Sequence, residues 1–129
     1  MTLKFEDMGL SKELLQVLAN LRFETPTEIQ EKTIPLALKG KDIIGESATG
    51  SGKTLAFGAP IIERMDVKDN SRALILTPTR ELAEQIAKNI HLFSSYKHLP
   101  VSVIYGGVGI DRQIRELQRA KIIVGTPGR

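Results

Sequence analysis

The sequence contains no cysteine and only two histidines, and it has no long hydrophobic run. The absence of cysteine excludes disulfide scaffolds, thiol nucleophiles and cysteine-rich zinc sites, and it fits a reducing compartment. His91 and His98 lack the spacing of a metal-binding motif, which excludes metalloprotease chemistry. The longest apolar stretch, residues 55–62, is too short to span a bilayer, and the polar N-terminus is unlike a signal peptide. We therefore expect a cytoplasmic protein, with the nucleus as the alternative.

Length and composition indicate a small globular domain. The chain has 129 residues, which allows one domain at most. Hydrophobic residues make up 41% and charged residues 26%, so neither a disordered nor a membrane-spanning chain is expected. The 18 basic and 15 acidic side chains give a net charge of +3, which by itself is too small to indicate nucleic-acid binding. Any such indication must come from where individual residues lie.

Four short runs of β-branched and apolar residues predict buried parallel strands. They are residues 42–45, 72–77, 101–105 and 121–125. Helical patterns separate the runs, which predicts right-handed crossovers and a parallel sheet covered by helices on both faces. We therefore predict an α/β fold, with a helical region over residues 1–38 and the α/β core over residues 39–129. The carboxyl ends of all four strands are expected at one edge of the sheet.

Apolar spacing predicts where the helices lie. A helix over about residues 12–21 has Ser11 as its N-cap, and a second helix begins at Thr27. The clearest helix follows Thr79, and another spans about residues 111–119. The apolar stripe of the first helix consists of Leu14, Leu15, Leu18 and Leu21. The buried face predicted for the helix after Thr79 consists of Leu82, Ile86, Ile90 and Phe93.

A glycine-rich loop follows the first predicted strand and precedes a helical pattern. It reads Ser47-Ala48-Thr49-Gly50-Ser51-Gly52-Lys53-Thr54. Glycines let backbone N–H groups turn toward phosphate oxygens, and the following helix N-terminus adds partial positive charge. Lys53 is expected to reach the terminal phosphates and Thr54 to ligate magnesium. Ser47 stands where the strict phosphate-loop pattern has glycine, and a simple glycine-rich turn is the alternative.

The other three strand exits carry residues suited to a phosphodiester backbone. Two of them share the pattern Thr-Pro-x-Arg, at residues 77–80 and 126–129, and the third is Gly106-Gly107. A helix start explains the threonines and prolines but not an arginine at the same offset twice. Arginine beside free helix N–H groups suits phosphate contacts, and a glycine pair permits a close backbone approach. A helix start and an ordinary turn remain the alternatives.

These motifs together resemble the N-terminal RecA-like domain of DEAD-box RNA helicases, over nearly the whole chain. The loop Ser47 to Thr54 is similar to motif I, Pro78 to Ala83 to motif Ia, Gly106-Gly107 to the GG motif, and Thr126 to Arg129 to motif Ib. The resemblance implies a RecA-like phosphate-loop fold, ATP and Mg²⁺ as cofactors, and RNA as partner. It gives Lys53 and Thr54 catalytic roles, with Thr54 also the metal ligand. The implied RNA-binding residues are Pro78, Thr79, Arg80, Glu81, Gly106, Gly107, Thr126, Pro127, Gly128 and Arg129.

A further match lies upstream, where residues 23–30 are similar to the family's Q motif and Phe5 to its separate aromatic. The resemblance implies that Gln30 reads adenine and that an aromatic ring stacks on the base. A glutamine amide can donate to and accept from an adenine edge at once. The same residues also fit a capping box, in which the Gln30 side chain turns back to the helix start. For Phe5, stacking on the base and packing in the core are both open. The implied cofactor-binding residues are Phe5, Phe23, Thr25, Gln30, Ser47, Ala48, Thr49, Gly50, Ser51, Gly52, Lys53 and Thr54.

Two residues depart from the family's pattern, and several of its features are missing. Arg22 stands where the family often has glycine, and Ala48 where it often has glutamine. A phosphate-loop ATPase needs a carboxylate near its magnesium, and none of the last three strands ends in one. The family's D-E-A-D and S-A-T motifs and its C-terminal RecA-like domain are also missing, so we expect a truncated piece of a larger enzyme. Its parent would couple ATP hydrolysis to local RNA unwinding, while this piece binds nucleotide and RNA without turnover.

Two alternatives remain open from the sequence. One is another phosphate-loop NTPase, such as a small kinase or nucleotidase. The other is a non-catalytic module that binds nucleotide or RNA. A DNA helicase of related fold is also compatible with phosphate contacts alone, although the motif strings favour RNA.

Overall fold

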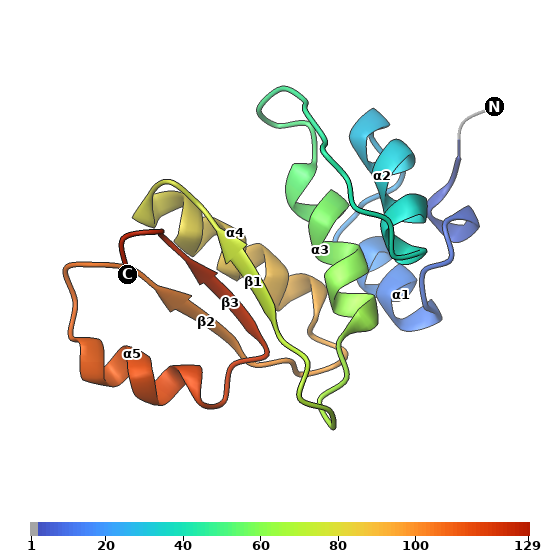
Figure 1. Ribbon diagram of the computed structural model, residues 1–129. Helices are drawn as coiled ribbons and strands as arrows, with labels where there is room; N and C mark the ends of the chain where they lie inside the picture. The colour runs from blue at the N-terminus through green and yellow to red at the C-terminus, as the bar shows by residue number, and fades with distance from the viewer. Residues whose placement is uncertain (1–2) are drawn as a thin grey trace. The chain divides into compact units, whose positions relative to one another are not determined.

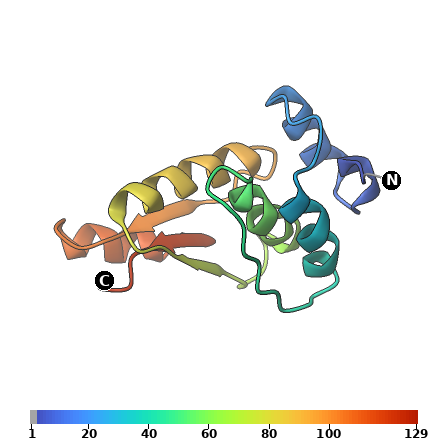
Figure 2. The ribbon, with the colours of Figure 1, turned by 90° about the horizontal axis from the view of Figure 1, so that it is seen from above.

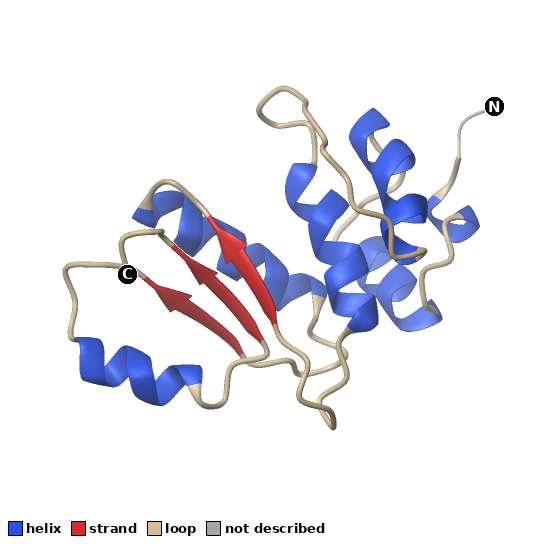
Figure 3. Cartoon of the chain, in the orientation of Figure 1, coloured by secondary structure: helices blue, strands red, loops and turns tan. Residues whose placement is uncertain are grey.

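The computed structural model describes residues 3–129, which form two compact units. One unit ends at Arg64 and the other begins at Met65. The first unit is helical, and the second contains a parallel sheet (Figures 1 and 3). The helix that follows the glycine-rich loop lies in the first unit, and the boundary predicted after residue 38 stays a prediction.

Three α-helices make up most of the first unit. They are α1 (Lys12–Asn20), α2 (Glu28–Leu38) and α3 (Lys53–Arg64), preceded by the 3-10 helix η1 (Phe5–Asp7). The predicted N-cap of α1 is confirmed, because the Ser11 hydroxyl accepts from the N–H of Leu14 at 3.2 Å. The same hydroxyl donates to a carboxylate oxygen of Glu63 at 2.8 Å, which joins α1 to α3. Helix α2 begins after Thr27, as predicted.

Leucine and isoleucine side chains from all three helices form the core of the first unit. Leu14, Leu18, Ile34, Leu55 and Ile62 are all buried. The other two members of the predicted α1 stripe are less covered: Leu15 is half-buried and Leu21 is exposed. The apolar stretch 55–62 lies within α3, and no helix among residues 3–129 has the length and apolar character to cross a membrane.

Arg22 follows α1 in the left-handed backbone region, at φ 65°. Its N–H donates to the carbonyl of Ala19, and the next N–H, that of Phe23, donates to Leu18 at 2.8 Å. These bonds close the C-terminus of the helix, where glycine is the residue that adopts a left-handed conformation without cost. The structure thus explains why the family often has glycine at this position.

Replacing Arg22 with glycine is therefore expected to stabilise the chain. A non-glycine residue pays about 1–2 kcal/mol in the left-handed region, and the greater freedom of glycine in the unfolded chain cancels roughly 0.4–1 kcal/mol of the gain. We expect urea denaturation to show a free energy of unfolding that is higher by about 0.5–1 kcal/mol. Arg22→Ala is the control, since it removes the charge and keeps the Cβ. A decrease in stability for Arg22→Gly would contradict the strain argument.

The second unit is a three-stranded parallel sheet with two helices. In chain order its elements are β1 (Ala73–Leu76), α4 (Arg80–Phe93), β2 (Val101–Ile104), α5 (Ile110–Leu117) and β3 (Ile122–Gly125). The strand order is β1-β3-β2, and Gly125 at the end of β3 is paired with both Leu76 and Ile104. Helix α4 packs on β2 and β3, and α5 packs on β2 (Figure 2). These strands and helices confirm the predicted elements to within two residues at each predicted end.

Residues 42–45 are the exception, because they form no strand. They lie in an extended loop, and the Ile44 side chain is fully exposed. An extended segment becomes part of a sheet only when a neighbouring strand supplies ladder hydrogen bonds. The described strands pair only with one another, so the apolar run at 42–45 has no ladder. The prediction of a fourth strand is wrong for the described residues.

The α/β fold is incomplete at β1, where two leucine side chains of the strand are left uncovered. Leu74 and Leu76 lie on the same face of this strand, and they are 64% and 59% exposed. On α4 the predicted buried face is confirmed for Ile86, Ile90 and Phe93, whereas Leu82 is 37% exposed. Ala83 and Ala87 complete the buried face instead, since small side chains allow α4 to approach the strands closely.

A buried lysine ties the connection between α3 and β1 to the sheet. Lys121 is 8% exposed, and its Nζ donates to the carbonyl of Asp69 at 2.5 Å and to the carboxylate of Asp69 at 3.3 Å. The pKa of Asp69 is lowered, first by hydrogen bonds from Ser71 and then by Lys121. Because the pKa of Asp69 is lower in the folded chain, its ionised carboxylate adds stability at pH values above the ordinary pKa. That stability is lost as the pH falls through the lowered pKa of the folded state.

Candidate nucleotide site and nucleic-acid edge

The glycine-rich loop precedes α3 in the first unit, as the motif requires. Gly50 and Gly52 have φ values of 80° and 87°, in the region that favours glycine. The hydroxyls of Ser47 and Ser51 are 2.5 Å apart and close the loop with a side-chain hydrogen bond. Lys53 begins α3 with its side chain exposed, beside helix N–H groups that have no partner within the helix. A helix N-terminus with these features can accommodate an anion, and the phosphate-binding role of the loop stays a prediction.

Gln30 joins this loop to the start of α2. Its side chain is 1% exposed, its Oε1 accepts from the N–H of Thr27 at 2.9 Å, and its Nε2 donates to the carbonyl of Gly52 at 3.1 Å. The first bond is half of the capping box, and the second reaches the phosphate loop. Both ends of the amide are therefore occupied, although each retains one donor or one lone pair. The adenine-reading role predicted from the resemblance stays a prediction.

The sequence did not single out the hydroxyl of Thr27 as part of the site. The Thr27 Oγ1 is buried without a hydrogen-bond partner among the described residues, and it lies next to Gly52. Among the predicted adenine-site residues, Phe5 is buried in η1 at 3% exposure, Phe23 is half-buried and Thr25 is exposed. The burial of Phe5 matches the core-packing alternative, and its stacking role remains untested.

Thr54 is the one predicted metal ligand, and its side chain is half-buried in the first turn of α3. Within residues 3–129 no group of three or more histidine or acidic side chains is placed to hold a metal ion. Magnesium prefers oxygen ligands and is commonly held by one or two carboxylates together with substrate phosphates. A single threonine hydroxyl therefore fits magnesium that arrives with nucleotide phosphates, and does not fit a site for the ion alone.

Beside Thr27, the first turn of α2 carries an exposed ion pair. Glu28 and Lys32 are 2.6 Å apart at their charged atoms, with 78% and 70% of their side chains exposed. The hydrogen bond and charge of Lys32 lower the pKa of Glu28, and the same pair raises the pKa of Lys32. Solvent screens such pairs strongly, so this one contributes little to the helix beyond its ordinary i, i+4 support.

In the second unit the three parallel strands end at one edge, as predicted for their exits (Figure 3). After β1, the Thr79 hydroxyl caps α4 by accepting from the N–H of Leu82 at 3.2 Å, so the helix-start interpretation holds here. Arg80 is the first residue of α4 and is exposed. After β3, a guanidinium nitrogen of Arg129 donates to the carbonyl of Val108 at 3.4 Å. The remaining predicted contacts Pro78, Glu81, Gly106, Gly107, Pro127 and Gly128 are exposed, and Thr126 is half-buried.

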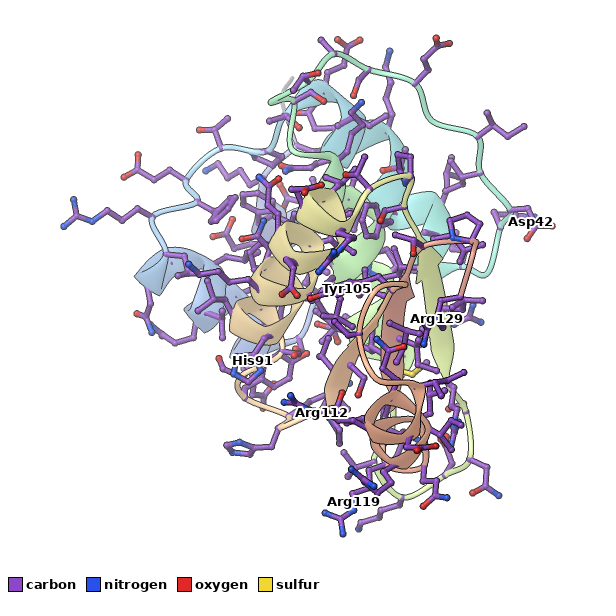
Figure 4. The ribbon with its side chains drawn as sticks, turned by 90° about the vertical axis from the view of Figure 1, so that its left-hand side faces the viewer. Asp42, His91, Tyr105, Arg112, Arg119 and Arg129 are labelled. Atoms are coloured by element: carbon purple, nitrogen blue, oxygen red, sulfur yellow. The ribbon has the colours of Figure 1, made fainter. Side chains whose placement is uncertain are left out.

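Tyr105 connects the β1 and β2 exits, and the sequence did not single it out as a site residue. The guanidinium carbon of Arg80 lies 4.4 Å from the centroid of the Tyr105 ring. The Tyr105 hydroxyl donates to a carboxylate oxygen of Glu84 on α4 at 2.7 Å. Figure 4 labels Tyr105 beside α4. Its only signal in the sequence was its place as the last residue of a predicted strand.

A groove of about 580 Å³ runs beside this edge, between α4, β2 and α5. Glu84, Tyr105, Arg112 and Gln113 line it. The Gln113 side chain is 5% exposed and donates to the Tyr105 carbonyl at 2.9 Å, which fixes the backbone at the end of β2. The groove therefore presents both charge signs next to an anchored aromatic residue.

The fold and the loop geometry define an α/β protein of the RecA-like phosphate-loop class. A sequence model of the DEAD/DEAH box helicase family matches residues 27–129. The chain belongs to this family of DEAD-box RNA helicases, which confirms the resemblance seen in its motifs.

Individual relatives agree with this assignment. The chain is 50% identical to the RNA helicase CrhR of Synechocystis, over 100% of this chain and 26% of that protein. It is 50% identical to the ATP-dependent RNA helicase CshA of Listeria monocytogenes, over 98% of this chain and 25% of that protein. The chain thus spans about a quarter of the length of these relatives.

Solved structures of two helicase-family proteins also match this chain. A DEAD box protein from Methanococcus jannaschii matches with a TM-score of 0.95 and 44% identity, covering 100% of this chain and 36% of that one. The RNA helicase Prp28 from Chaetomium thermophilum, bound to ADP, matches with a TM-score of 0.85 and 41% identity, covering 97% of this chain and 32% of that one.

Proposed function

We propose that this chain supplies the phosphate loop and part of the RNA-binding surface of an ATP-dependent RNA helicase. The parent protein couples ATP hydrolysis to local unwinding of RNA, which it clamps between this region and a C-terminal RecA-like domain. The observation that carries the proposal is the arrangement of the Thr79–Arg80, Gly106-Gly107 and Thr126–Arg129 motifs at one sheet edge, in a chain that belongs to a helicase family. We place the protein in the cytoplasm, consistent with its lack of cysteine.

The proposed nucleotide is ATP with Mg²⁺, bound at the N-terminus of α3. Backbone N–H groups of the loop and helix orient the phosphates, Lys53 neutralises their charge, and Thr54 provides one oxygen ligand for the ion. The ion, when bound, polarises the terminal phosphate. Gln30 reads adenine with its remaining donor and lone pair. A match to a helicase bound to ADP supports the choice of adenine.

Hydrolysis itself is assigned to the parent protein and not to these residues alone. The residues that follow β1, β2 and β3 are Thr77, Tyr105 and Thr126, so no carboxylate stands at these exits to orient an attacking water. The role proposed for residues 3–129 is therefore to hold nucleotide and RNA. A non-catalytic binding module describes the chain taken alone, and other phosphate-loop NTPases are disfavoured by its family.

RNA binding at the sheet edge is proposed to depend on Arg80. Its guanidinium is exposed at the N-terminus of α4, where helix N–H groups and positive charge together favour a phosphate. The contacts are to the backbone, so they position a strand without reading its bases. The glycine pair after β2 leaves this edge free of side chains, and a Cβ on Gly106 would meet nothing within 4 Å.

The test is Arg80→Ala in a titration with single-stranded RNA. We expect affinity to fall about three- to tenfold, and the slope of log affinity against log salt to decrease by about one, as for loss of a phosphate contact. Arg72→Ala is the matched control, because Arg72 precedes β1 at the opposite edge of the sheet. If the two variants lose the same affinity, the loss reflects net charge, and the proposed edge is wrong.

A further inference from the structure

Arg80 and Glu84 are four residues apart on α4, yet they form no ion pair. Opposite charges at this spacing on a helix lie close enough to attract each other. Within residues 3–129, ion pairs join Lys32 to Glu28, Arg112 to Glu116 and Lys121 to Asp69, and Arg80 takes part in no ion pair. The carboxylate of Glu84 instead accepts the hydroxyl of Tyr105 at 2.7 Å. Tyr105, which follows β2, therefore binds the carboxylate that is spaced to pair with Arg80.

The ring of Tyr105 also packs against the guanidinium of Arg80. Arg80 packs its guanidinium 4.4 Å from the ring centroid. A guanidinium stacked on an aromatic ring interacts through its face, whereas its N–H donors point outward in its plane. Those donors are the ones that a bidentate phosphate contact needs. An ion pair with Glu84 would occupy them.

The position of Tyr105 is itself fixed by neighbouring residues. It follows β2 directly, and its carbonyl accepts from the buried amide of Gln113 at 2.9 Å. Gly107 has φ 87°, and a Cβ there would lie 3.4 Å from a guanidinium nitrogen of Arg80. The glycine pair therefore leaves room for the arginine as well as for an approaching strand.

We propose that Tyr105 is a positioning residue that keeps Glu84 away from Arg80, so that the arginine remains available to an RNA phosphate. The hydroxyl of Tyr105 holds the carboxylate, and its ring supports the guanidinium. This inference rests on the proposed function, since it concerns how the RNA-binding arginine is prepared. It assigns the tyrosine and the glutamate a joint role in RNA affinity without direct contact to RNA.

The decisive variant is Tyr105→Phe, which keeps the ring and removes only the hydroxyl. Glu84 is then free to pair with Arg80, and we expect RNA affinity to fall about three- to tenfold with a salt slope lower by about one. Adding Glu84→Gln to this variant removes the competing carboxylate and is expected to restore both quantities. A purely structural role of Tyr105 would not be rescued by a change at Glu84.

A double-mutant cycle separates this rescue from a general effect of charge. Removing any acidic side chain near RNA raises affinity somewhat, so Glu84→Gln is measured in both backgrounds. The proposal requires a larger gain in the Tyr105→Phe background than in the wild-type chain. Chemical-shift titration of the ¹⁵N-labelled 129-residue chain at low salt measures even weak binding, and thermal melting checks that each variant is folded.

The outcomes distinguish this inference from the function on which it rests. If Arg80→Ala weakens binding while Tyr105→Phe binds as the wild type does, RNA binding stands and the positioning role is overturned. Equal gains from Glu84→Gln in both backgrounds also overturn it. If Arg80→Ala itself leaves binding unchanged, the proposed RNA edge fails first. Loss in Tyr105→Phe with rescue by Glu84→Gln supports both.

Discussion

Replacing Gly52 with alanine is expected to destabilise the chain by roughly 2–5 kcal/mol and to weaken nucleotide binding about a hundredfold. Gly52 has φ 87°, which costs a non-glycine residue about 1–2 kcal/mol. An added Cβ would also lie 2.3 Å from the Nε2 of Gln30. Gln30 is buried and hydrogen-bonded at both ends of its amide, so it cannot move aside freely, and overpacking adds about 1–3 kcal/mol. Displacing the loop moves the N–H groups that we propose bind the nucleotide phosphates.

Gly50→Ala is the matched control for this substitution. Gly50 has a similar φ of 80°, but an added Cβ would meet nothing within 4 Å. Gly50→Ala is therefore expected to destabilise the chain by the backbone term alone, about 1–2 kcal/mol, without the clash. Urea denaturation measures both free energies of unfolding, and calorimetric titration with magnesium-ADP measures binding. Equal destabilisation by the two substitutions would show that the contact between Gln30 and Gly52 is absent in solution.

Substitutions of Gln30 are expected to remove the preference for adenine nucleotides. We expect the wild-type chain to bind magnesium-ADP more tightly than magnesium-GDP by at least about tenfold, because guanine mismatches a donor and an acceptor of the amide. In Gln30→Ala this ratio should fall to about one, and the lost cap on Thr27 should cost roughly 0.5–2 kcal/mol of stability. Calorimetric titration with both nucleotides measures the ratio.

Gln30→Glu separates the cap from the recognition of adenine. A carboxylate can still accept from the N–H of Thr27, but it cannot donate to the carbonyl of Gly52 or to an adenine nitrogen. We therefore expect this variant to keep the N-cap and to lose the preference for ADP over GDP. Because the added negative charge weakens the binding of ADP and GDP alike, the ratio of the two affinities is the informative quantity. If the ratio survives in both variants, Gln30 does not read adenine and its role is structural.

Both effects depend on a contact that local sequence rules do not show. The capping-box spacing of Thr27 and Gln30 predicts the first bond of the amide, because those residues are three apart on one helix start. The bond from Gln30 to Gly52 joins residues 22 apart, and it exists because α2 packs against α3. The motifs therefore indicated Gln30 and Gly52 separately, and the packing of α2 against α3 joins them by a hydrogen bond.

The sheet edge shows the same division between local and tertiary information. Parallel β1, β2 and β3 follow from short β-branched runs separated by helical patterns, and their parallel order places the Thr-Pro-x-Arg and Gly-Gly segments at one edge. Tyr105 and Glu84 were not predicted as site residues, because their 21-residue separation carries no periodic signal. Their contact arises only when α4 lies against β2.

The sequence by itself determined the class of fold, the family and the positions of the helices and of three strands, since apolar periodicity, capping residues and motif spacing are local properties. It could not determine whether residues 42–45 become a strand, because ladder hydrogen bonds require a neighbour that is distant in the chain. Nor could it show that Tyr105 contacts both Arg80 and Glu84. Pairing of side chains from different elements is decided by packing, and for that reason only the tertiary structure revealed that Arg80 packs on the Tyr105 ring while Glu84 accepts the Tyr105 hydroxyl.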